Sequence, residues 1–190
     1  MNIKQLNDVS GEARELLSKA QQAYGFIPNL LGVLANAPSA LKAYMTLNGI
    51  FDETSLSPTE RQIVLLTVSF ENECSYCMAA HSAIATMQKV DSEIVSALRR
   101  GQPIVDDKLE ALRLFTQEVV SSRGWPSEET KCRFLEAGYE PSVMLEVVLG
   151  VSLKTLSNYS NHLADIELDA NFKKMAWSKS SCENGSCKCS

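Results

Sequence analysis

The segment between Glu71 and His81 holds two cysteines three residues apart and a histidine four residues after the second cysteine. In a helix, which advances by about 100° per residue, Cys74, Cys77 and His81 fall within roughly 60° of one another on one face. An imidazole one turn from a thiol can take its proton, and a helix N-terminus favours the thiolate, which is the reactive form. A second thiol within reach lets an oxidised sulfur close to a disulfide. The spacing therefore predicts a redox site.

Zinc is the competing interpretation of this cluster. Structural zinc sites normally take four ligands, commonly two cysteine pairs or one pair with two histidines, whereas the cluster supplies three. Cys187 and Cys189 would complete such a set, but they lie far along the chain in a polar segment. We therefore predict no metal. The sequence contains no Gly-rich phosphate-binding loop, so we predict no organic cofactor either.

Composition and charge exclude several classes of protein. The chain has 190 residues and a formal net charge of −5, and no basic cluster exceeds the pair Arg99-Arg100, so it has no footprint for a nucleic-acid backbone. Residues 1–10 lack a signal pattern, and no apolar stretch is suited to cross a bilayer. We expect a cytoplasmic protein that binds neither nucleic acid nor membrane. In that setting a Cys-x-x-Cys pair indicates redox or metal chemistry rather than a structural disulfide.

Helix caps and helix breakers recur at helix-length intervals, and alternation typical of strands is nearly absent, so we predict an all-α fold. The clearest start is a capping box at residues 57–60, Ser-Pro-Thr-Glu, with proline at the first helical position. Cys74 stands at the start of another helix. The expected helices span approximately residues 11–24, 28–34, 38–51, 58–70, 74–88, 92–100, 106–122, 128–138 and 141–162.

The helical pattern stops near Asn171, which predicts one domain over residues 1–170 and a disordered polar tail over residues 171–190. The tail carries Cys182, Cys187 and Cys189. These thiols either relay electrons to the Cys-x-x-Cys pair, bind a soft metal ion, or belong to a passive end of the chain. Cys132 stands alone, and we expect it to be a small buried hydrophobe.

Residues 60–85 resemble the alkyl hydroperoxidase D and carboxymuconolactone decarboxylase superfamily. The resemblance extends upstream to residues 24–29, Tyr-Gly-Phe-Ile-Pro-Asn, and to Pro38, and downstream to residues 158–162, Asn-Tyr-Ser-Asn-His, with Leu168-Asp169. It implies an AhpD-like multi-helix bundle with the Cys-x-x-Cys pair at the start of a helix. Such subunits assemble as homotrimers or homohexamers and reduce peroxides while a histidine and a glutamate relay protons. By motif position, the resemblance implies that Cys77 is attacked by peroxide, that Cys74 resolves it and that His81 belongs to the relay.

One position departs from the superfamily pattern. The relay glutamate that the resemblance implies twelve residues before the first cysteine is Gln62 here, and an amide cannot accept and return a proton as a carboxylate does. Glu71 and Glu73 are candidates to supply the carboxylate. We favour Glu71, which is one turn before Cys74 if the helix is continuous, whereas Glu73 is offset by about 100°. Either acid is alternatively a glutamate that stabilises a helix N-terminus.

Two further residues near these motifs have open roles. His162 is the other histidine of the chain, and we favour a helix cap or a subunit contact over catalysis. Tyr76, between the cysteines, is either a packing residue or a hydrogen-bond donor to the site. The apolar run over residues 143–156 suggests that part of the surface is buried between subunits.

Three functions are compatible with these patterns. A thiol peroxidase or disulfide oxidoreductase, with a role in antioxidant defence, would reduce a peroxide at the cysteine pair and be reset by a dithiol or thioredoxin-like reductant. A carboxymuconolactone decarboxylase-type lyase would need cationic groups to hold a carboxylate and an enolate, and the cation nearest the motif is Arg61. A non-enzymatic redox sensor would change its assembly or partner on oxidation. The cysteine pair favours the first of these.

Overall fold

The structure is a computed structural model and describes residues 1–179, which form helices joined by short connections, with no strand among them. The all-α prediction is confirmed, and the expected helix ends agree with the observed ones to within a few residues. In chain order the elements are η1 (Leu6–Asp8), α1 (Gly11–Tyr24), α2 (Asn29–Leu34), α3 (Pro38–Asp52), α4 (Pro58–Glu71), α5 (Ser75–Met87), α6 (Ser92–Arg100), α7 (Asp107–Ser121), α8 (Glu128–Glu136), α9 (Pro141–Ala164) and η2 (Ala170–Met175).

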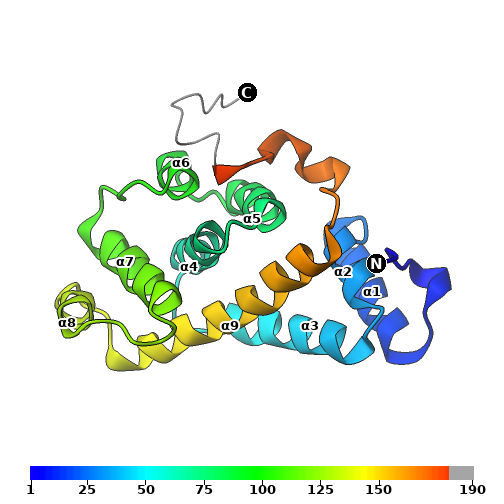
Figure 1. Cartoon of the computed structure of the whole chain (residues 1–190), viewed down its shortest axis with the longest axis horizontal. Helices are drawn as coiled ribbons and strands as arrows, with labels where there is room; N and C mark the ends of the chain where they lie inside the picture. Colours follow the sequence, from blue (N-terminus) through cyan, green and yellow to red (C-terminus); the bar gives the residue numbers. More distant parts are fainter. Residues whose placement is uncertain (180–190) are drawn as a thin grey trace.

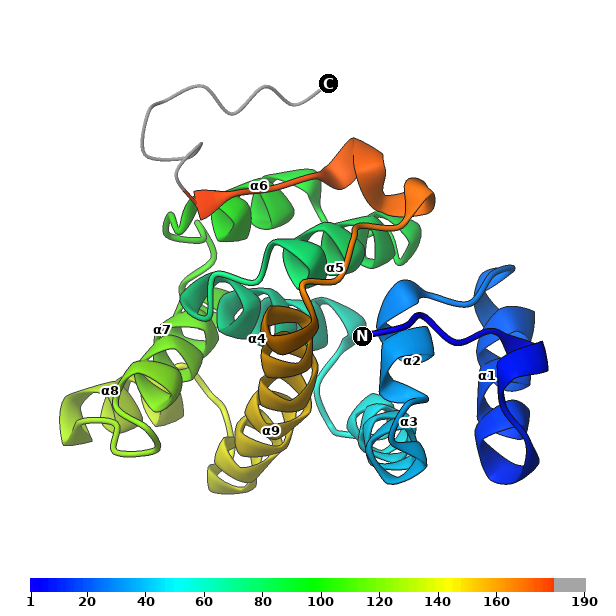
Figure 2. The same cartoon turned by 45° about the vertical axis from the view of Figure 1, so that its right-hand side comes forward.

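Helix α4 lies at the centre of the bundle (Figures 1 and 2), in contact with α5, α6, α7 and α9. Its residues from Gln62 to Ser69 are all buried, which explains why this helix is apolar on nearly every side. The long helix α9 runs across the molecule and also contacts α2, α3 and α5. Helices α1 and α8 lie at opposite ends of the bundle.

Two large hydrophobic clusters and a small one formed by Ala85, Val90 and Val95 fill the interior of the described chain, and α5 contributes to all of them. Met78 packs into the larger cluster with side chains of α4, α7 and α9. Cys74 and Cys77 pack into the second cluster, with side chains of α1, α2, α3 and η2. The cysteine pair therefore lies at the boundary between α5, α9 and the N-terminal helices.

The chain turns sharply between α4 and α5. Asn72 ends α4, Glu73 adopts a left-handed conformation with φ of 54°, and Cys74 is the N-cap of α5. The backbone N–H of Cys74 donates to the carbonyl of Ser69 over 2.9 Å. The continuous helix on which the placement of Glu71 depended is therefore absent.

The packed part of the chain continues beyond Asn171, where the sequence pattern predicted the start of the tail. Element η2 contacts α5 and buries Phe172, and Trp177 is buried with its indole N–H donating to the carbonyl of Arg99 over 2.7 Å. These aromatic side chains are isolated among lysines and small residues, so the composition of the segment conceals them. Cys182, Cys187 and Cys189 lie outside the described residues.

Cys132 corrects another expectation, because its side chain is exposed. Helix α8 buries Phe134 against α7 and presents its other side to solvent. Cys132 is two residues from Phe134 and so points roughly 200° away from it.

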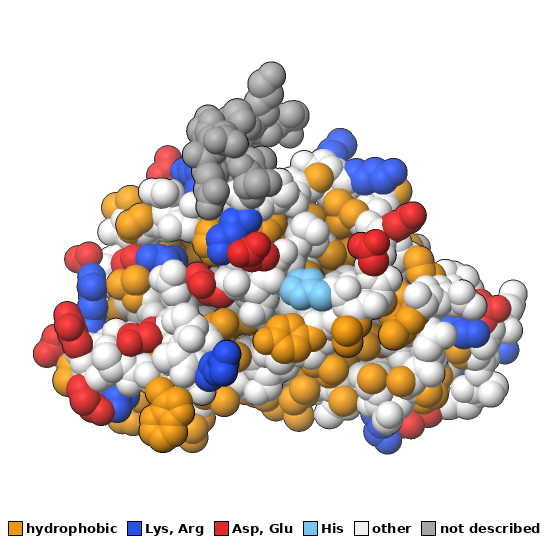
Figure 3. All heavy atoms as spheres, in the orientation of Figure 1, with side chains coloured by type: hydrophobic (Ala, Val, Ile, Leu, Met, Phe, Trp, Pro, Cys, Tyr) orange, Lys and Arg blue, Asp and Glu red, His pale blue; other side chains and the backbone are white. Residues whose placement is uncertain are grey.

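The face of the molecule drawn in Figure 3 carries acidic and basic side chains interspersed, with apolar side chains between them. No large basic patch is visible on this face. None of the helices within residues 1–179 combines the length and the apolar composition that crossing a membrane requires.

Candidate active site

A small cavity of about 80 Å³ opens beside Cys77, between α5, α9 and the N-terminal helices. Its wall is mainly apolar and aromatic, with a few polar groups. The lining residues are Tyr24, Pro28, Leu30, Leu31, Tyr44, Met45, Asn48, Tyr76, Cys77, Ala80, His81, Ile84, Lys154 and Phe172. The cavity therefore suits a small organic molecule, and it brings two of the predicted site residues, Cys77 and His81, to one space.

The two cysteines are close together, and neither is in a disulfide. Cys74 is the N-cap of α5 and Cys77 lies in its first turn, and their side chains are hydrogen-bonded to each other. Both residues are buried, each with only 1% of its surface exposed. Cys77 lines the cavity, so a substrate would reach the sulfur through it.

Polar side chains of α9 surround the sulfur of Cys77. The Asn161 Nδ2 donates to Cys77 Sγ over 3.4 Å, and Ser157 Oγ lies 3.9 Å from the same sulfur. Lys154 and Asn158 extend this set along one face of the helix, at positions i, i+3, i+4 and i+7. We call Lys154, Ser157, Asn158 and Asn161 the polar stripe of α9. All four side chains are buried.

The electrostatics of the site distinguish the two thiols. Burial alone raises the pKa of the Cys77 thiol, but the hydrogen bond from Cys74 and the nearby Lys154 ammonium lower it. Asn158 adds to their effect, and the pKa of Cys77 falls below its ordinary value of 9.0. The hydrogen bond to Cys77, with burial, raises the pKa of Cys74. Cys77 is therefore the thiolate of the pair, and Cys74 keeps its proton.

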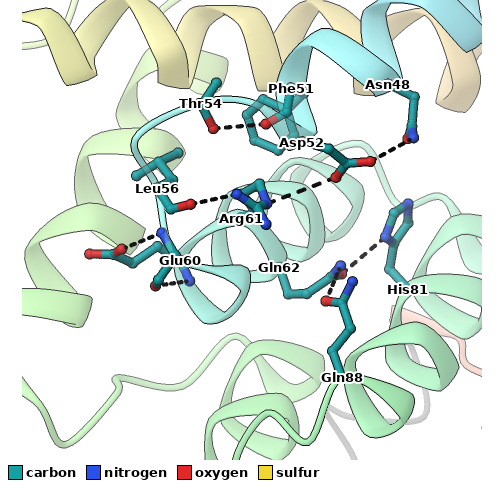
Figure 4. Close-up of polar contacts among 11 residues, drawn as sticks. Asn48, Phe51, Asp52, Thr54, Leu56, Glu60, Arg61, Gln62, His81 and Gln88 are labelled. Atoms are coloured by element: carbon teal, nitrogen blue, oxygen red, sulfur yellow. Dashed lines mark hydrogen bonds and ion pairs between the residues drawn. The ribbon is translucent and has the colours of Figure 1, made fainter.

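His81 is buried and held in one tautomer. Its Nδ1 lies 3.1 Å from Gln62 Oε1, and the Gln62 Nε2 donates to Gln88 Oε1 over 3.1 Å (Figure 4). Because a carboxamide oxygen only accepts, Nδ1 carries the proton and Nε2 carries the lone pair. Burial and the charge of Lys154 hold the pKa of His81 well below 6.5, so the ring is neutral. Gln62, at the position of the expected acid, thus orients the imidazole.

Neither glutamate candidate lies in the cavity wall. The Glu71 carboxylate accepts a hydrogen bond from Gln117 Nε2 on α7 over 2.9 Å. Glu73 is exposed and pairs with Lys179 over 3.2 Å. The break between α4 and α5 directs Glu71 to α7 instead of to the thiols. The structure therefore gives no support to the placement of Glu71 in the proton relay.

Tyr76 is a hydrogen-bond donor as well as part of the cavity wall. Its hydroxyl donates to Asp169 Oδ2 over 2.5 Å and accepts from the backbone N–H of Leu30 over 3.3 Å. Asp169 also accepts from the N–H of Asn29 at the start of α2. These contacts join α5, α2 and the segment after α9 around the cavity. His162, by contrast, is exposed, is stacked on Tyr159 at 6.3 Å, and is not part of the cavity wall.

Lys154 is the main residue that the sequence analysis missed. It is 1% exposed, and within residues 1–179 its Nζ pairs with no carboxylate and interacts with the Cys77 side chain. Arg61, the cation that the sequence placed nearest the motif, donates to the carbonyl of Leu56 and pairs with Asp52 at 3.9 Å (Figure 4). A signal was present, because the polar stripe continues the buried face of α9, with Val147 two turns and Gly150 one turn before Lys154.

Metal ligation has no geometric basis in the part of the chain that the structure describes. Within residues 1–179, no three histidine, cysteine, aspartate or glutamate side chains come together in an arrangement able to hold a metal ion.

Residues 38–118 match the model of the carboxymuconolactone decarboxylase family. No curated protein gives a significant match to the sequence. The solved structures with similar folds include an alkylhydroperoxidase AhpD core protein, described as peroxidase-related, from Ralstonia eutropha JMP134. The two sequences are 19% identical and the TM-score is 0.82, and the match covers 90% of this chain and 93% of the Ralstonia protein.

Two further structures have the same fold. A peroxidase-related protein from Silicibacter sp. TM1040 is 19% identical with a TM-score of 0.78, covering 90% of this chain and 92% of its own. The debrominase Bmp8, as a cysteine-to-alanine variant in complex with 2,3,4-tribromopyrrole, is 18% identical with a TM-score of 0.76, covering 92% of this chain and 95% of its own.

Proposed function

We propose that the chain is a thiol-dependent peroxidase of the AhpD-like carboxymuconolactone decarboxylase superfamily, with support from the family match over residues 38–118 and from the AhpD-like fold. The observation that carries the proposal is the Cys77 sulfur, which lines the cavity with its pKa lowered mainly by the Cys74 hydrogen bond and Lys154 despite burial. A thiolate is the form that attacks peroxides. The adjacent Cys74 thiol supplies the second sulfur for a disulfide.

The reaction begins when the Cys77 thiolate attacks the terminal oxygen of a hydroperoxide. The O–O bond breaks, an S–O bond forms, and the products are a sulfenic acid on Cys77 and an alkoxide that takes up a proton. Cys74 then attacks the sulfenic sulfur, which releases water and leaves a disulfide. The neutral His81, with its lone pair on Nε2, accepts the Cys74 proton and passes it to the departing hydroxide.

A second substrate must reset the pair. A dithiol or thioredoxin-like protein attacks the disulfide and leaves both cysteines reduced. Since both sulfurs are buried, the reductant reaches them after local opening of the helices around the cavity or through a small dithiol that enters it. We expect small dithiols to support turnover in the assay.

Lys154 keeps a decarboxylase-type lyase as the second candidate. Such a lyase needs a cation to hold a carboxylate or an enolate, and a buried ammonium in an apolar cavity is such a group. The cavity also has aromatic walls suited to a small ring, as in the ligand of the debrominase with the same fold. A carboxymuconolactone and a bromopyrrole therefore belong in the substrate panel beside hydroperoxides.

The test is peroxide consumption with a small dithiol, comparing wild type with Cys77→Ser and Cys74→Ser. We expect Cys77→Ser to abolish turnover and Cys74→Ser to stop after one equivalent, with a sulfenic acid trapped on Cys77. Cys132→Ser is the matched control, because this exposed cysteine on α8 lies outside the cavity wall. Stoichiometric oxidation without turnover would indicate a redox sensor, and a sulfenic acid found only on Cys74 would reverse the assignment.

Assembly into a homotrimer or homohexamer is part of the proposal. Helix α9 exposes Leu145, Val148, Tyr159 and Leu163, with exposed fractions of 73%, 46%, 53% and 81%. Apolar side chains gathered on one helix are typical of a surface that a second copy covers. Light scattering at micromolar concentration should give an oligomer, and a monomer would contradict this part of the proposal.

A further inference from the structure

Lys154 carries the only ammonium group among the described residues that line the cavity. We propose that Lys154 is the general acid of the site, which gives its proton to the alkoxide released when Cys77 cleaves a hydroperoxide. This inference rests on the proposed peroxidase function and names a proton donor for its first step.

The environment of Lys154 is unlike that of a structural ion pair. Its side chain is buried, and within the described residues its Nζ pairs with no carboxylate; the side chain with which it interacts is that of Cys77. The carboxylates near the cavity have other partners, since Asp52 contacts Arg61 and Asn48, and Asp169 contacts Tyr76. A buried ammonium without a partner is costly. The negative charge that offsets this cost is the thiolate of Cys77.

The other groups beside the cavity are less suited to protonate an alkoxide. His81 holds its proton on Nδ1, towards Gln62, so its second nitrogen can accept a proton but has none to give. The Cys74 thiol is hydrogen-bonded to Cys77 and is consumed in the second step. Tyr44 also faces the cavity, and burial, with the charge of Cys77, raises the pKa of its hydroxyl. It is a neutral donor and the one serious competitor.

The proton balance of the reaction fits this role. In the reduced site the Cys77 thiolate and the Lys154 ammonium together have no net charge. Attack on the hydroperoxide ROOH forms the S–O bond of the sulfenic acid and breaks the O–O bond, and the leaving RO⁻ takes the Lys154 proton to become ROH. Condensation with the Cys74 thiol then releases water. The oxidised site holds a disulfide and a neutral amine, so neither state leaves an isolated charge in the cavity.

The balance also defines how the pair is reset. A dithiol supplies two electrons and two protons. These restore the thiol on Cys74, the thiolate on Cys77 and the ammonium on Lys154. The proton that Lys154 donates is thus restored at reduction rather than drawn from solvent during the attack. This removes the need for a carboxylate at residue 62, where the chain has glutamine.

The test compares leaving groups that differ in their need for a proton. The attack is followed in a single turnover with tert-butyl hydroperoxide, which releases a strongly basic alkoxide, and with peracetic acid, which releases acetate. Rates are divided by the thiolate fraction of Cys77, measured by its ultraviolet absorbance, so that loss of the thiolate is not mistaken for loss of the acid. The variants are Lys154→Met, Lys154→Arg and Tyr44→Phe, each checked for helicity and cooperative melting.

We expect Lys154→Met to slow the attack on tert-butyl hydroperoxide by about 10² to 10⁴, the usual contribution of a positioned acid, and the attack on peracetic acid by about tenfold at most. Lys154→Arg keeps the positive charge but holds its proton. It should therefore keep the Cys77 thiolate and show the same selective slowing with tert-butyl hydroperoxide. Equal slowing with both oxidants, or the selective loss appearing in Tyr44→Phe instead, would overturn the assignment. If wild type reacts with neither oxidant, the proposed peroxidase function itself fails.

Discussion

The stability of the fully reduced protein should rise with pH between about pH 7 and about pH 8 because of Cys77. Burial raises the pKa of this thiol, but the Cys74 hydrogen bond and Lys154 more than compensate, so the folded pKa lies below 9.0. At a pH between the pKa of Cys77 in the folded protein and its pKa in the unfolded protein, the unfolded chain binds a proton that the folded chain does not. Stability therefore increases with pH there, and it is lost as the pH falls through the folded pKa.

One proton of difference is worth about 1.36 kcal/mol per pH unit. The pKa of Cys74 is raised, first by its hydrogen bond to Cys77, so this thiol subtracts a small amount as its unfolded form begins to ionise. The net expectation is roughly 1 kcal/mol of added stability between about pH 7 and about pH 8. The pKa of His81 is lowered from 6.5 by burial and Lys154, so its contribution falls below this window.

The measurement is urea unfolding of the protein kept reduced with a phosphine, at several pH values, in wild type and in Cys77→Ser. Serine does not titrate in this range, so the variant should show a nearly flat dependence while wild type shows the slope. Equal slopes in the two proteins would mean that Cys77 is an ordinary thiol at neutral pH. That result would remove the basis for its reactivity.

Three further variants test other contacts. Tyr76→Phe removes the buried hydrogen bond to Asp169 and should lower the free energy of unfolding by about 1.5–3 kcal/mol; no change in urea midpoint would show that the bond contributes nothing. Gly150→Ala places a methyl group 2.7 Å from an α4 side chain and 2.8 Å from an α3 side chain, so a loss of about 1–3 kcal/mol is expected, while Gly49→Ala, with open space, should lose none. Glu71→Gln should leave the kcat/KM for peroxide within about twofold of wild type, whereas a loss of the 10² to 10⁴ expected of a positioned acid would restore Glu71 to the proton relay.

Helix positions were predictable because their signals are local. Ser57 accepts from the N–H of Glu60, and the Glu60 carboxylate accepts from the N–H of Ser57, as the capping box predicted. Gly25 and Gly101 end α1 and α6 in left-handed conformations. Such caps depend on a few neighbouring residues, so the sequence specifies them without knowledge of the tertiary fold.

The environment of the cysteine pair was harder to predict, because it depends on contacts between distant segments. The cysteines and His81 were proposed from their spacing, and they lie at the N-cap and within the first two turns of α5. Glu71 contacts α7 and lies outside the cavity wall, because a single left-handed residue, Glu73, redirects the chain between α4 and α5. Lys154 lies on α9, far along the chain, and only the packing of α9 on α5 brings it to the sulfur. Its charge was therefore absent from the predicted site.

Lys154 also explains why glutamine can occupy residue 62. A carboxylate there would lie about as close to His81 as Gln62 Oε1 does, at 3.1 Å, and would add an anion to a site in which Cys77 and Lys154 already balance. An extra buried charge without a partner is costly, and it would favour protonation of the imidazole. The amide avoids this and still fixes the proton on Nδ1 of His81. The cation on α9 and the amide on α4 are therefore two parts of one arrangement, in which the thiolate keeps its charge and the imidazole stays neutral.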